Sequence, residues 1–302
     1  MPLPCCVRDA ATVILMRPSE AAIAEVCMIR RHDKSGFFGG AYVFAGGQLD
    51  DADSDTAMLG HFSPSVRQHC AQRLNPTPDR PLSEDQRVGL WVAACRELFE
   101  EVGIVLGSGP NLHGLADERS AVHREPQRFA HLHAHGRLRV DLSTLSYWGH
   151  WVTPSAEPKR YDTRFFVALA PLGQEPNVDD HEATELGWLT PPQALAQQNA
   201  GIINLPPPTL LSLAELAREL NQAESLMSWW EGIKRKNVEP ILPKVIPQDA
   251  SIPRTILLPW DPQYAAASGE SIQVSAAAAI GLKALCSRLV FADDHWQMVQ
   301  GE

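Results

Sequence analysis

Short apolar runs and one long amphipathic stretch dominate the pattern of the chain. Residues 11–16 and 25–29 are apolar, favour β-structure and are joined by a turn-forming segment, so they predict a β-hairpin. Over 84–102, apolar residues recur at helical spacing. The apolar face of this predicted helix contains Val88, Trp91, Val92, Cys95, Leu98, Phe99 and Val102. Ser83 is the expected N-cap and Gly103 the expected C-cap.

The rest of the chain alternates between strand-like and helix-like segments. A glycine-rich stretch surrounds a short predicted strand at 41–44, and residues 51–83 look irregular and insert-like. Further strands are expected at 147–154, 163–171, 183–191 and in "RLVFA" near the C-terminus, and further helices within 118–146 and at about 209–230. Strands interleaved with helices favour an α/β or α+β fold over an all-α fold.

Composition and charge limit the kinds of molecule that the chain is expected to bind. With 302 residues, 44% of them hydrophobic and 21% charged, the chain is typical of a soluble globular protein. The formal net charge of −10 argues against broad binding to nucleic acid or a membrane surface. A bound divalent cation would still allow an anionic small-molecule substrate. We therefore expect a small-molecule partner, no nucleic acid and no membrane.

Cysteine usage and the chain start suggest a location. The six cysteines form no CxxC pair and show no regular spacing, which favours a reducing compartment. The first residues lack the pattern of a secretory leader, and no run of 18 apolar residues is present. The resulting expectation is a cytoplasmic protein.

Glu97, Glu100 and Glu101 form a cluster of like charge. At about 100° per residue, Glu97 and Glu101 lie about 40° apart and Glu100 about 60° to the other side, so they share one face of the predicted helix. Like charges at these spacings destabilise a helix, and a bridging cation would remove the repulsion. Such oxygen ligands suit Mg²⁺ or Mn²⁺, and Arg96 can orient a carboxylate. On these residues alone, a solvated acidic face and a metal site both remain open.

The surrounding sequence resembles the Nudix box, G-x5-E-x7-R-E-U-x-E-E-x-G-U, in which U is aliphatic. "RELFEEVGI" at 96–104 matches every fixed position of the second half. The first half begins at Gly47, and Asp53 stands where the pattern has glutamate. Between Asp53 and Arg96 lie 42 residues where the pattern has seven, which is an insertion of 35. Because Asp53 is shorter than glutamate, we expect a structural or salt-bridging role for it.

Further segments resemble one branch of this superfamily. "FAGG" at 44–47 is similar to its F-P-G-G, and Glu182, six positions before Trp188, is similar to its late glutamate–tryptophan pattern. The long insertion, "HWVTP", "RYDTRFF", "INLPPPT" and "LLPWDPQY" resemble the branch of the mammalian peroxisomal coenzyme A diphosphatase. Gly36 stands where the coenzyme A signature of this branch has its second arginine. The positions that fit this signature are Arg31, Gly40, Phe44, Gly46 and Gly47.

The resemblance implies a Nudix α/β/α sandwich with a mixed sheet, a helical insertion and a C-terminal extension. It also implies a metal-dependent pyrophosphohydrolase that uses Mg²⁺ or Mn²⁺. The favoured substrate is coenzyme A or an acyl derivative, cut to 3′,5′-ADP and phosphopantetheine. ADP-ribose, NADH and dinucleoside polyphosphates are the alternative substrates, and a non-catalytic nucleotide-sensing module is the alternative of another class.

The resemblance also assigns roles to individual residues. The implied metal ligands are the Gly46 carbonyl, Glu97, Glu100, Glu101 and Glu182. The implied catalytic residues are Arg96, Glu97, Glu100 and Glu182, and the general base is left open between Glu97 and Glu182. Substrate contacts are expected from Arg31 and Phe44 of the signature, and from Tyr161 and Arg164, which flank a strand and suit phosphate recognition.

The expected organisation is a Nudix domain at 1–200, followed by a C-terminal helix and an extended segment at 201–302 that packs on the same domain. Within the first part we expect an insertion at about 54–83 and a helical insert at about 115–146. Many Nudix proteins dimerise, so the resemblance leaves a homodimer open.

Overall fold

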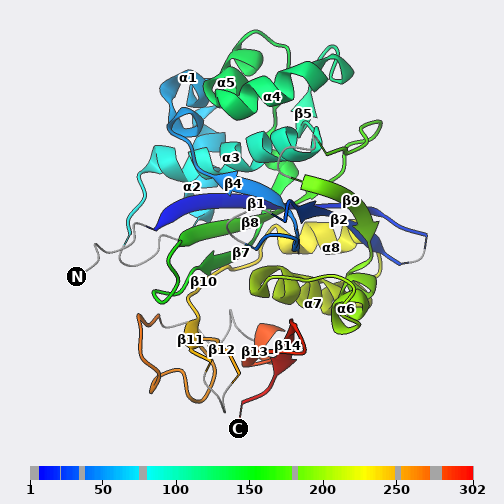
Figure 1. The fold of residues 1–302 in the computed structure, drawn as a ribbon. Coiled ribbons are helices and arrows are strands. Elements are labelled where there is room, and N and C mark those ends of the chain that lie inside the picture. Colours follow the sequence, from blue (N-terminus) through cyan, green and yellow to red (C-terminus); the bar gives the residue numbers. More distant parts are fainter. Residues whose placement is uncertain are drawn as a thin grey trace.

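A mixed sheet of eight strands lies between two layers of helices, and a second, smaller sheet follows beyond one layer (Figure 1). The computed structural model describes residues 7–20, 22–33, 38–74, 80–178, 183–248, 253–272 and 281–301. The arrangement confirms the predicted α/β sandwich. In the part of the chain that is described, no helix is both long and apolar enough to span a membrane.

The large sheet is centred on β1 (Arg8–Pro18) and β8 (Tyr161–Leu169), which run parallel. Its strand order is β10-β7-β8-β1-β2-β3, with β4 also paired to β1 and β9 to β2. The remaining strands are β2 (Ala24–Arg31), β3 (Tyr42–Val43), β4 (Ala45–Gln48), β7 (Leu145–Val152), β9 (Ala183–Leu189) and β10 (Pro240–Ile241). Helices cover both faces, and for this reason β1 and β8 are apolar over consecutive positions.

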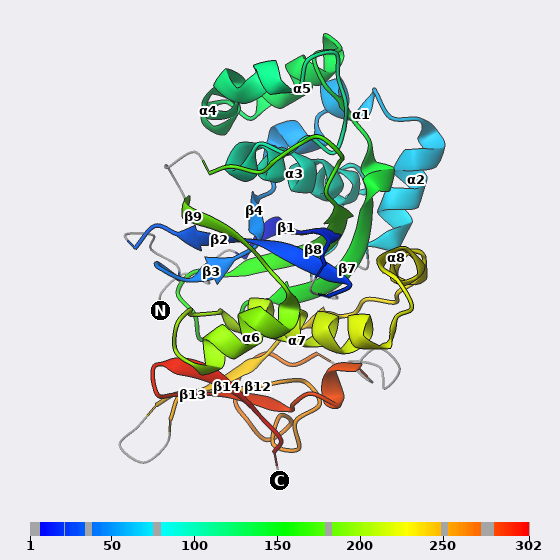
Figure 2. The same ribbon diagram turned by 90° about the vertical axis from the view of Figure 1, so that its right-hand side faces the viewer.

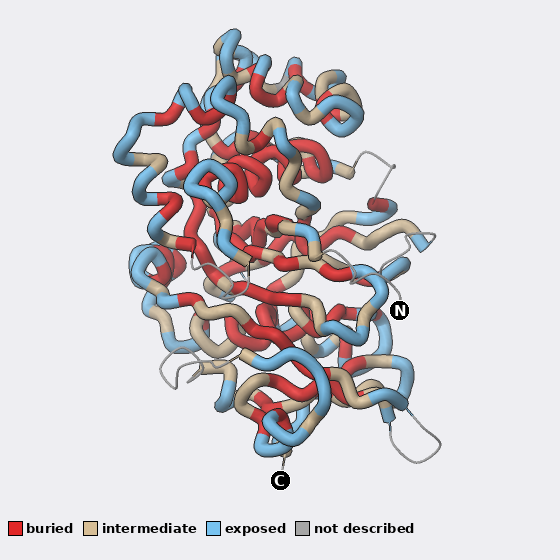
Figure 3. The backbone as a smooth tube through the Cα atoms, turned by 90° about the vertical axis from the view of Figure 1, so that its left-hand side faces the viewer, coloured by how far each residue is buried: buried red, intermediate tan, exposed pale blue. Residues whose placement is uncertain are grey.

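Helix α3 (Glu84–Val102) packs on one face of this sheet and is nearly all buried from Val88 onward. Around it lie η1 (Asp51–Ser54), α1 (Thr56–Leu59), α2 (Pro64–Arg73), α4 (Ala116–Arg124) and α5 (Gln127–Ala134). Short connections are β5 (Gly107–Ser108), η2 (His113–Leu115), β6 (Arg139–Val140) and η3 (Leu142–Thr144). In Figure 3 the buried backbone concentrates in α3 and in the middle of the sheet.

The opposite face carries α6 (Pro191–Asn199), α7 (Pro207–Gln222) and α8 (Leu226–Ile233). Below these helices in Figure 2 lies the small antiparallel sheet. Its strands, in order, are β11 (Lys244–Ile246), β12 (Thr255–Leu257), β13 (Arg288–Ala292) and β14 (His295–Val299). One apolar core fills the space between α3 and the large sheet, and a second joins the large sheet to α7 and the small sheet.

Local sequence signals located the main elements. The predicted hairpin forms from β1 and β2, and its register places Met16 opposite Val26. Ser83 caps α3 by accepting a hydrogen bond from the Gln86 amide, and Gly103 ends the helix at φ 73°. At this φ a side chain would be strained, so the glycine gives a defined helix end.

Some predicted boundaries were wrong. The part of the expected irregular stretch 51–83 that lies at 51–73 is largely helical, because Asp55 and Ser63 cap α1 and α2, and Pro64 stands at a first helical position that tolerates proline. The single helix expected at 209–230 is two helices, since Ser225 forms a capping box that starts α8. The strand expected at 41–44 is only the two-residue β3 on β2, and a separate strand, β4, follows it and pairs with β1.

A buried ionic network crosses the sheet at β7 and β8. Asp162 is fully buried and lies 2.8 Å from Arg164 Nη1. The same nitrogen donates to Asp9 at 2.9 Å, and His150 Nε2 contacts the Asp162 carboxylate. Burial, followed by the nearby Arg164 charge, lowers the pKa of His150 and favours its neutral form. Asp162 therefore compensates the charge of a fully buried arginine.

We predict that Asp162→Asn lowers the free energy of unfolding by about 3 kcal/mol, because removal of one partner leaves a buried charge poorly compensated. Urea unfolding measures the effect. Asp117→Asn, at an exposed position in the first turn of α4, serves as the control and should change stability by about 1 kcal/mol or less. Equal effects of the two substitutions would contradict the role given to the network.

Candidate active site

The three glutamates of α3 do not form a solvated face. Glu97, Glu100 and Glu101 are 8%, 4% and 4% exposed, which excludes that interpretation. The Gly46 amide of β4 donates to Glu101 Oε2 at 2.8 Å. A Cβ on Gly47 would lie 2.5 Å from the Glu97 carboxylate, so glycine is what lets the strand approach the helix. The two halves of the split box are therefore in contact.

Arg96 connects these halves through its guanidinium. Its Nε and Nη2 donate to the two carboxylate oxygens of Asp53, each at 2.8 Å, in a bidentate pair. Its Nη1 donates to Glu97 Oε1 and Glu100 Oε1, both at 2.9 Å, and Nη2 also reaches the Gln48 carbonyl. Asp53 thus has the salt-bridging role that was expected. The 42 residues between Asp53 and Arg96 leave the box intact in space.

Burial changes the acidity of this cluster. The pKa of Glu97 is raised to about 7 by desolvation, with Arg96 opposing the rise and Glu100 adding to it. Desolvation also raises the pKa of Asp53, against the attraction of Arg96. Burial removes water from these carboxylates and makes their ionised forms less stable. A cation bound beside them would stabilise the ionised forms.

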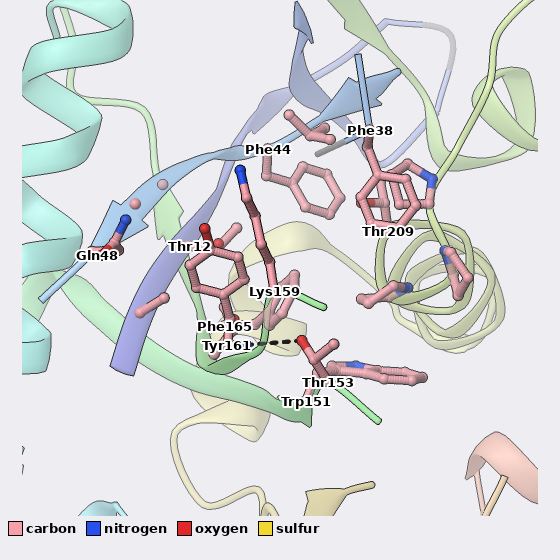
Figure 4. A pocket seen from close by; sticks show the side chains of 18 of the residues that line it. Thr12, Phe38, Phe44, Gln48, Trp151, Thr153, Lys159, Tyr161, Phe165 and Thr209 are labelled. Carbon is pink, nitrogen blue, oxygen red and sulfur yellow. Dashed lines mark hydrogen bonds between the residues drawn. The ribbon is translucent and has the colours of Figure 1, made fainter. Parts of the chain in front are cut away.

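A cavity of about 1020 Å³ opens next to the cluster. Glu97, Glu100 and Arg96 line one end, together with the glycines of β4. From there the cavity crosses the strands of the large sheet toward α7 and the small sheet. Figure 4 shows part of the lining, with Thr12, Phe165 and Tyr161 on the strands and Lys159 extending inward from the loop after β7.

Among the lining residues that the sequence analysis missed are His123 and Lys159. His123 of α4 places Nδ1 3.3 Å from Glu100 Oε2 and also lines the cavity. Lys159 lines it from the loop between β7 and β8. Neither belongs to the box, and His123 lies in a helical insert with no motif to single it out. The only sequence signal for Lys159 is its position next to the "RYDTRFF" segment.

The expected substrate contacts divide into two groups. Arg31, Phe44 and Tyr161 line the cavity. Arg164 does not, because its side chain is 0% exposed and pairs with Asp9 and Asp162 instead. A fully buried arginine whose charge is already compensated has a structural role here.

Two other residues that the sequence singled out have no described position in the site. Glu182, the implied further metal ligand, and Gly36, at the altered signature position, both lie outside the described residues.

The donor atoms at the acidic end suit a hard divalent cation. Glu97, Glu100 and Glu101 supply carboxylate oxygens, which Mg²⁺ and Mn²⁺ prefer. Within the described ranges, however, no three His, Cys, Asp or Glu side chains are already arranged as a metal cage. Arg96 instead holds Glu97 and Glu100 against its own guanidinium. The residues fit a metal in chemistry, and the individual ligands stay predictions.

We predict that Glu97→Gln stabilises the metal-free protein by about 3 kcal/mol at pH 8, since one pKa unit corresponds to about 1.4 kcal/mol. Folded Glu97 has a pKa of about 7 against an ordinary value of 4.5. Between these values the folded protein retains a proton that the unfolded chain releases, so stability falls as pH rises. Glutamine cannot ionise and removes this loss.

Urea unfolding in EDTA at pH 4 and pH 8 measures the gain from Glu97→Gln. The gain should be small at pH 4, where the carboxyl is largely protonated in both states, and complete at pH 8. The same gain at both values would contradict the raised pKa of Glu97.

Several known proteins are similar to this chain in sequence. A family profile described as the NUDT19 Nudix domain matches residues 7–216. The acyl-coenzyme A diphosphatase NUDT19 of Homo sapiens is 32% identical over 239 residues, which cover 67% of this chain and 62% of the relative. Its Xenopus laevis counterpart is 28% identical over 227 residues, covering 64% and 59%. The matched region thus spans less than two thirds of the length of these relatives.

A solved structure supports the same grouping. The crystal structure of a Nudix hydrolase from Alicyclobacillus acidocaldarius superimposes with a TM-score of 0.56 at 28% identity, covering 72% of this chain and 93% of that chain. The family profile extends over most of the chain, including both halves of the box that Arg96 joins. The chain therefore belongs to the NUDT19 Nudix domain family of the Nudix hydrolases.

Proposed function

We propose that the chain is a metal-dependent pyrophosphohydrolase that cleaves coenzyme A or acyl-coenzyme A to 3′,5′-ADP and (acyl-)phosphopantetheine. One observation carries the proposal: the buried carboxylates of Glu97 and Glu100, with Arg96, line a cavity of about 1020 Å³, which has room for far more than a diphosphate. The activity for which the human and Xenopus relatives are named supports the choice of substrate.

The proposed reaction is a substitution at phosphorus. The oxygen of a water molecule forms a bond to one phosphorus atom, the bridging P–O bond breaks, and the other phosphate leaves with the electron pair. A base accepts the proton of the water. Glu97 and Glu182 are the two candidates for that base, and of these the structure describes Glu97.

The residues of the site would bind and orient the substrate. Arg31 and Lys159 line the cavity and can contact the anionic phosphates. Arg96 holds Glu97 and Glu100 in fixed orientations. Glu97, Glu100, Glu101, Glu182 and the Gly46 carbonyl are the proposed ligands of Mg²⁺ or Mn²⁺. The bound ion would neutralise the charge of the diphosphate and polarise its phosphoryl oxygen.

The expected cytoplasmic location stays a prediction, and the homodimer that the resemblance left open stays open. The four described cysteines, Cys27, Cys70, Cys95 and Cys286, are free and buried, which is compatible with a reducing compartment.

We predict that the protein with Mg²⁺ or Mn²⁺ hydrolyses coenzyme A faster than ADP-ribose, NADH or diadenosine polyphosphates. Chromatography with mass detection of 3′,5′-ADP and phosphopantetheine measures the reaction. Glu100→Gln should lower kcat by about 100-fold or more, as expected when a group that stabilises the transition state is removed.

Glu118→Gln is a matched control, because Glu118 lies on α4, pairs with Arg128 and Arg137, and does not line the cavity. Absence of hydrolysis with every substrate and both metals would refute the enzyme. Faster turnover of ADP-ribose than of coenzyme A would refute the substrate. Full activity of Glu100→Gln would refute its place in the site.

We also predict that Gly47→Ala lowers kcat by roughly 10–100-fold while stability changes little, because small displacements of catalytic groups are costly. The added Cβ would lie 2.5 Å from the Glu97 carboxylate, so this carboxylate has to move out of the orientation in which Arg96 holds it. Gly187→Ala is the control, since nothing lies within 4 Å of a Cβ built there. Steady-state kinetics and thermal unfolding measure the two effects. Normal kcat in folded Gly47→Ala would contradict the close approach of β4 to Glu97.

A further inference from the structure

The floor of the cavity is a strip that crosses four strands. Gln48 of β4 pairs with Ala10 of β1, Ala10 with Thr163 of β8, and Thr163 with Trp151 of β7. All four residues line the cavity. With neighbouring strands about 4.8 Å apart, the strip is roughly 14 Å long. The site therefore extends far beyond the position of a diphosphate.

The two ends of the strip differ in chemistry. At the Gln48 end, the Gln48 carbonyl accepts a hydrogen bond from Arg96, and the glutamates of α3 lie close by. At the other end, Trp151 belongs to the apolar cluster that also contains Ile256 and Trp296 of the small sheet. A substrate with a charged and an apolar part would place them at opposite ends.

The far end is built largely by the C-terminal part of the chain. Ile256 of β12, Trp296 of β14 and Pro243 line it, and so do the prolines 206–208 at the start of α7. Residues 243, 256 and 296 lie outside the range that the family profile matches, 7–216. This end of the cavity is thus formed in part by residues that lie outside the matched Nudix region.

The lining at this end suits a hydrocarbon better than a nucleobase. Proline has no amide N–H, so the segment 206–208 cannot donate a backbone hydrogen bond to the acceptor atoms of a base. Arg254 also lines the cavity, where it pairs with Glu157 and lies over the Trp296 ring at 5.7 Å. Its charge is already compensated by Glu157. Trp151, Ile256 and Trp296 supply apolar surface beside it that can bury methylene groups.

We propose that β12 and β14 of the small sheet, through Ile256 and Trp296, form the subsite for the acyl-bearing end of the pantetheine arm. This inference rests on the proposed function, and it deepens it by assigning acyl-chain selectivity to the C-terminal sheet. The box end holds the diphosphate and the floor strip carries the arm between the two ends. Preference for an acylated over a free thiol is then decided at Ile256 and Trp296.

The test compares free coenzyme A with octanoyl-coenzyme A in the full chain. In Ile256→Ala the ratio of kcat/KM for octanoyl-coenzyme A to that for free coenzyme A should fall roughly tenfold, as expected for methylenes lost from an apolar pocket. Ile256→Val should show a smaller fall and serves if the alanine variant does not fold. Leu258→Ala is the matched control, because Leu258 is fully buried in the same cluster but does not line the cavity.

A second measurement separates this inference from the proposed function. Calorimetry in EDTA follows the binding of octanoyl-pantetheine, which has neither a diphosphate nor a need for a metal. Binding should weaken roughly tenfold in Ile256→Ala and be unchanged in Leu258→Ala. Hydrolysis of coenzyme A with an unchanged ratio in folded Ile256→Ala would overturn the subsite and leave the function standing. Octanoyl-pantetheine binding that depends on Ile256, without hydrolysis of any coenzyme A species, would overturn the function alone. Failure of the wild type to bind octanoyl-pantetheine would overturn the subsite.

Discussion

The site depends on one buried arginine. Arg96 makes a bidentate pair with Asp53 and at the same time donates to Glu97, Glu100 and the Gln48 carbonyl. A guanidinium has five N–H donors in a fixed plane, so a single side chain can hold a turn, a strand and a helix in register. Lysine could not replace it, because a point charge on a flexible stem does not fix these directions.

The close approach of β4 to α3 has a related cause. Gly47 carries no side chain, so the backbone of β4 can lie against the Glu97 carboxylate, and the neighbouring Gly46 amide donates to Glu101. The resulting burial raises the pKa of Glu97 to about 7, which destabilises the metal-free fold at neutral pH. Clustered buried carboxylates thus lower the stability of the metal-free protein, a cost that is common where function requires buried charge.

The chain places its functional groups in layers that come from distant segments. Helix α3 and β4 form the acidic end, β1, β7 and β8 form the floor, and the small sheet closes the far end. Local signals were sufficient for α3, since Ser83, the apolar spacing and Gly103 act within the helix itself. They were insufficient for β14, which pairs with β13 and places Trp296 in the second apolar core.

The sequence by itself determined the box: the spacing of Glu97, Glu100 and Glu101 on one helix face, the glycines of β4 and the salt-bridging role of Asp53 follow from residue chemistry. It also indicated the mixed α/β sandwich. Only the tertiary structure decided which basic side chains can contact a substrate. Arg164 is paired with Asp9 and Asp162, whereas Lys159 and His123 line the cavity. The tertiary structure alone joined Ile256 and Trp296 to Trp151. Such contacts depend on strand order and layer packing, which no local pattern encodes.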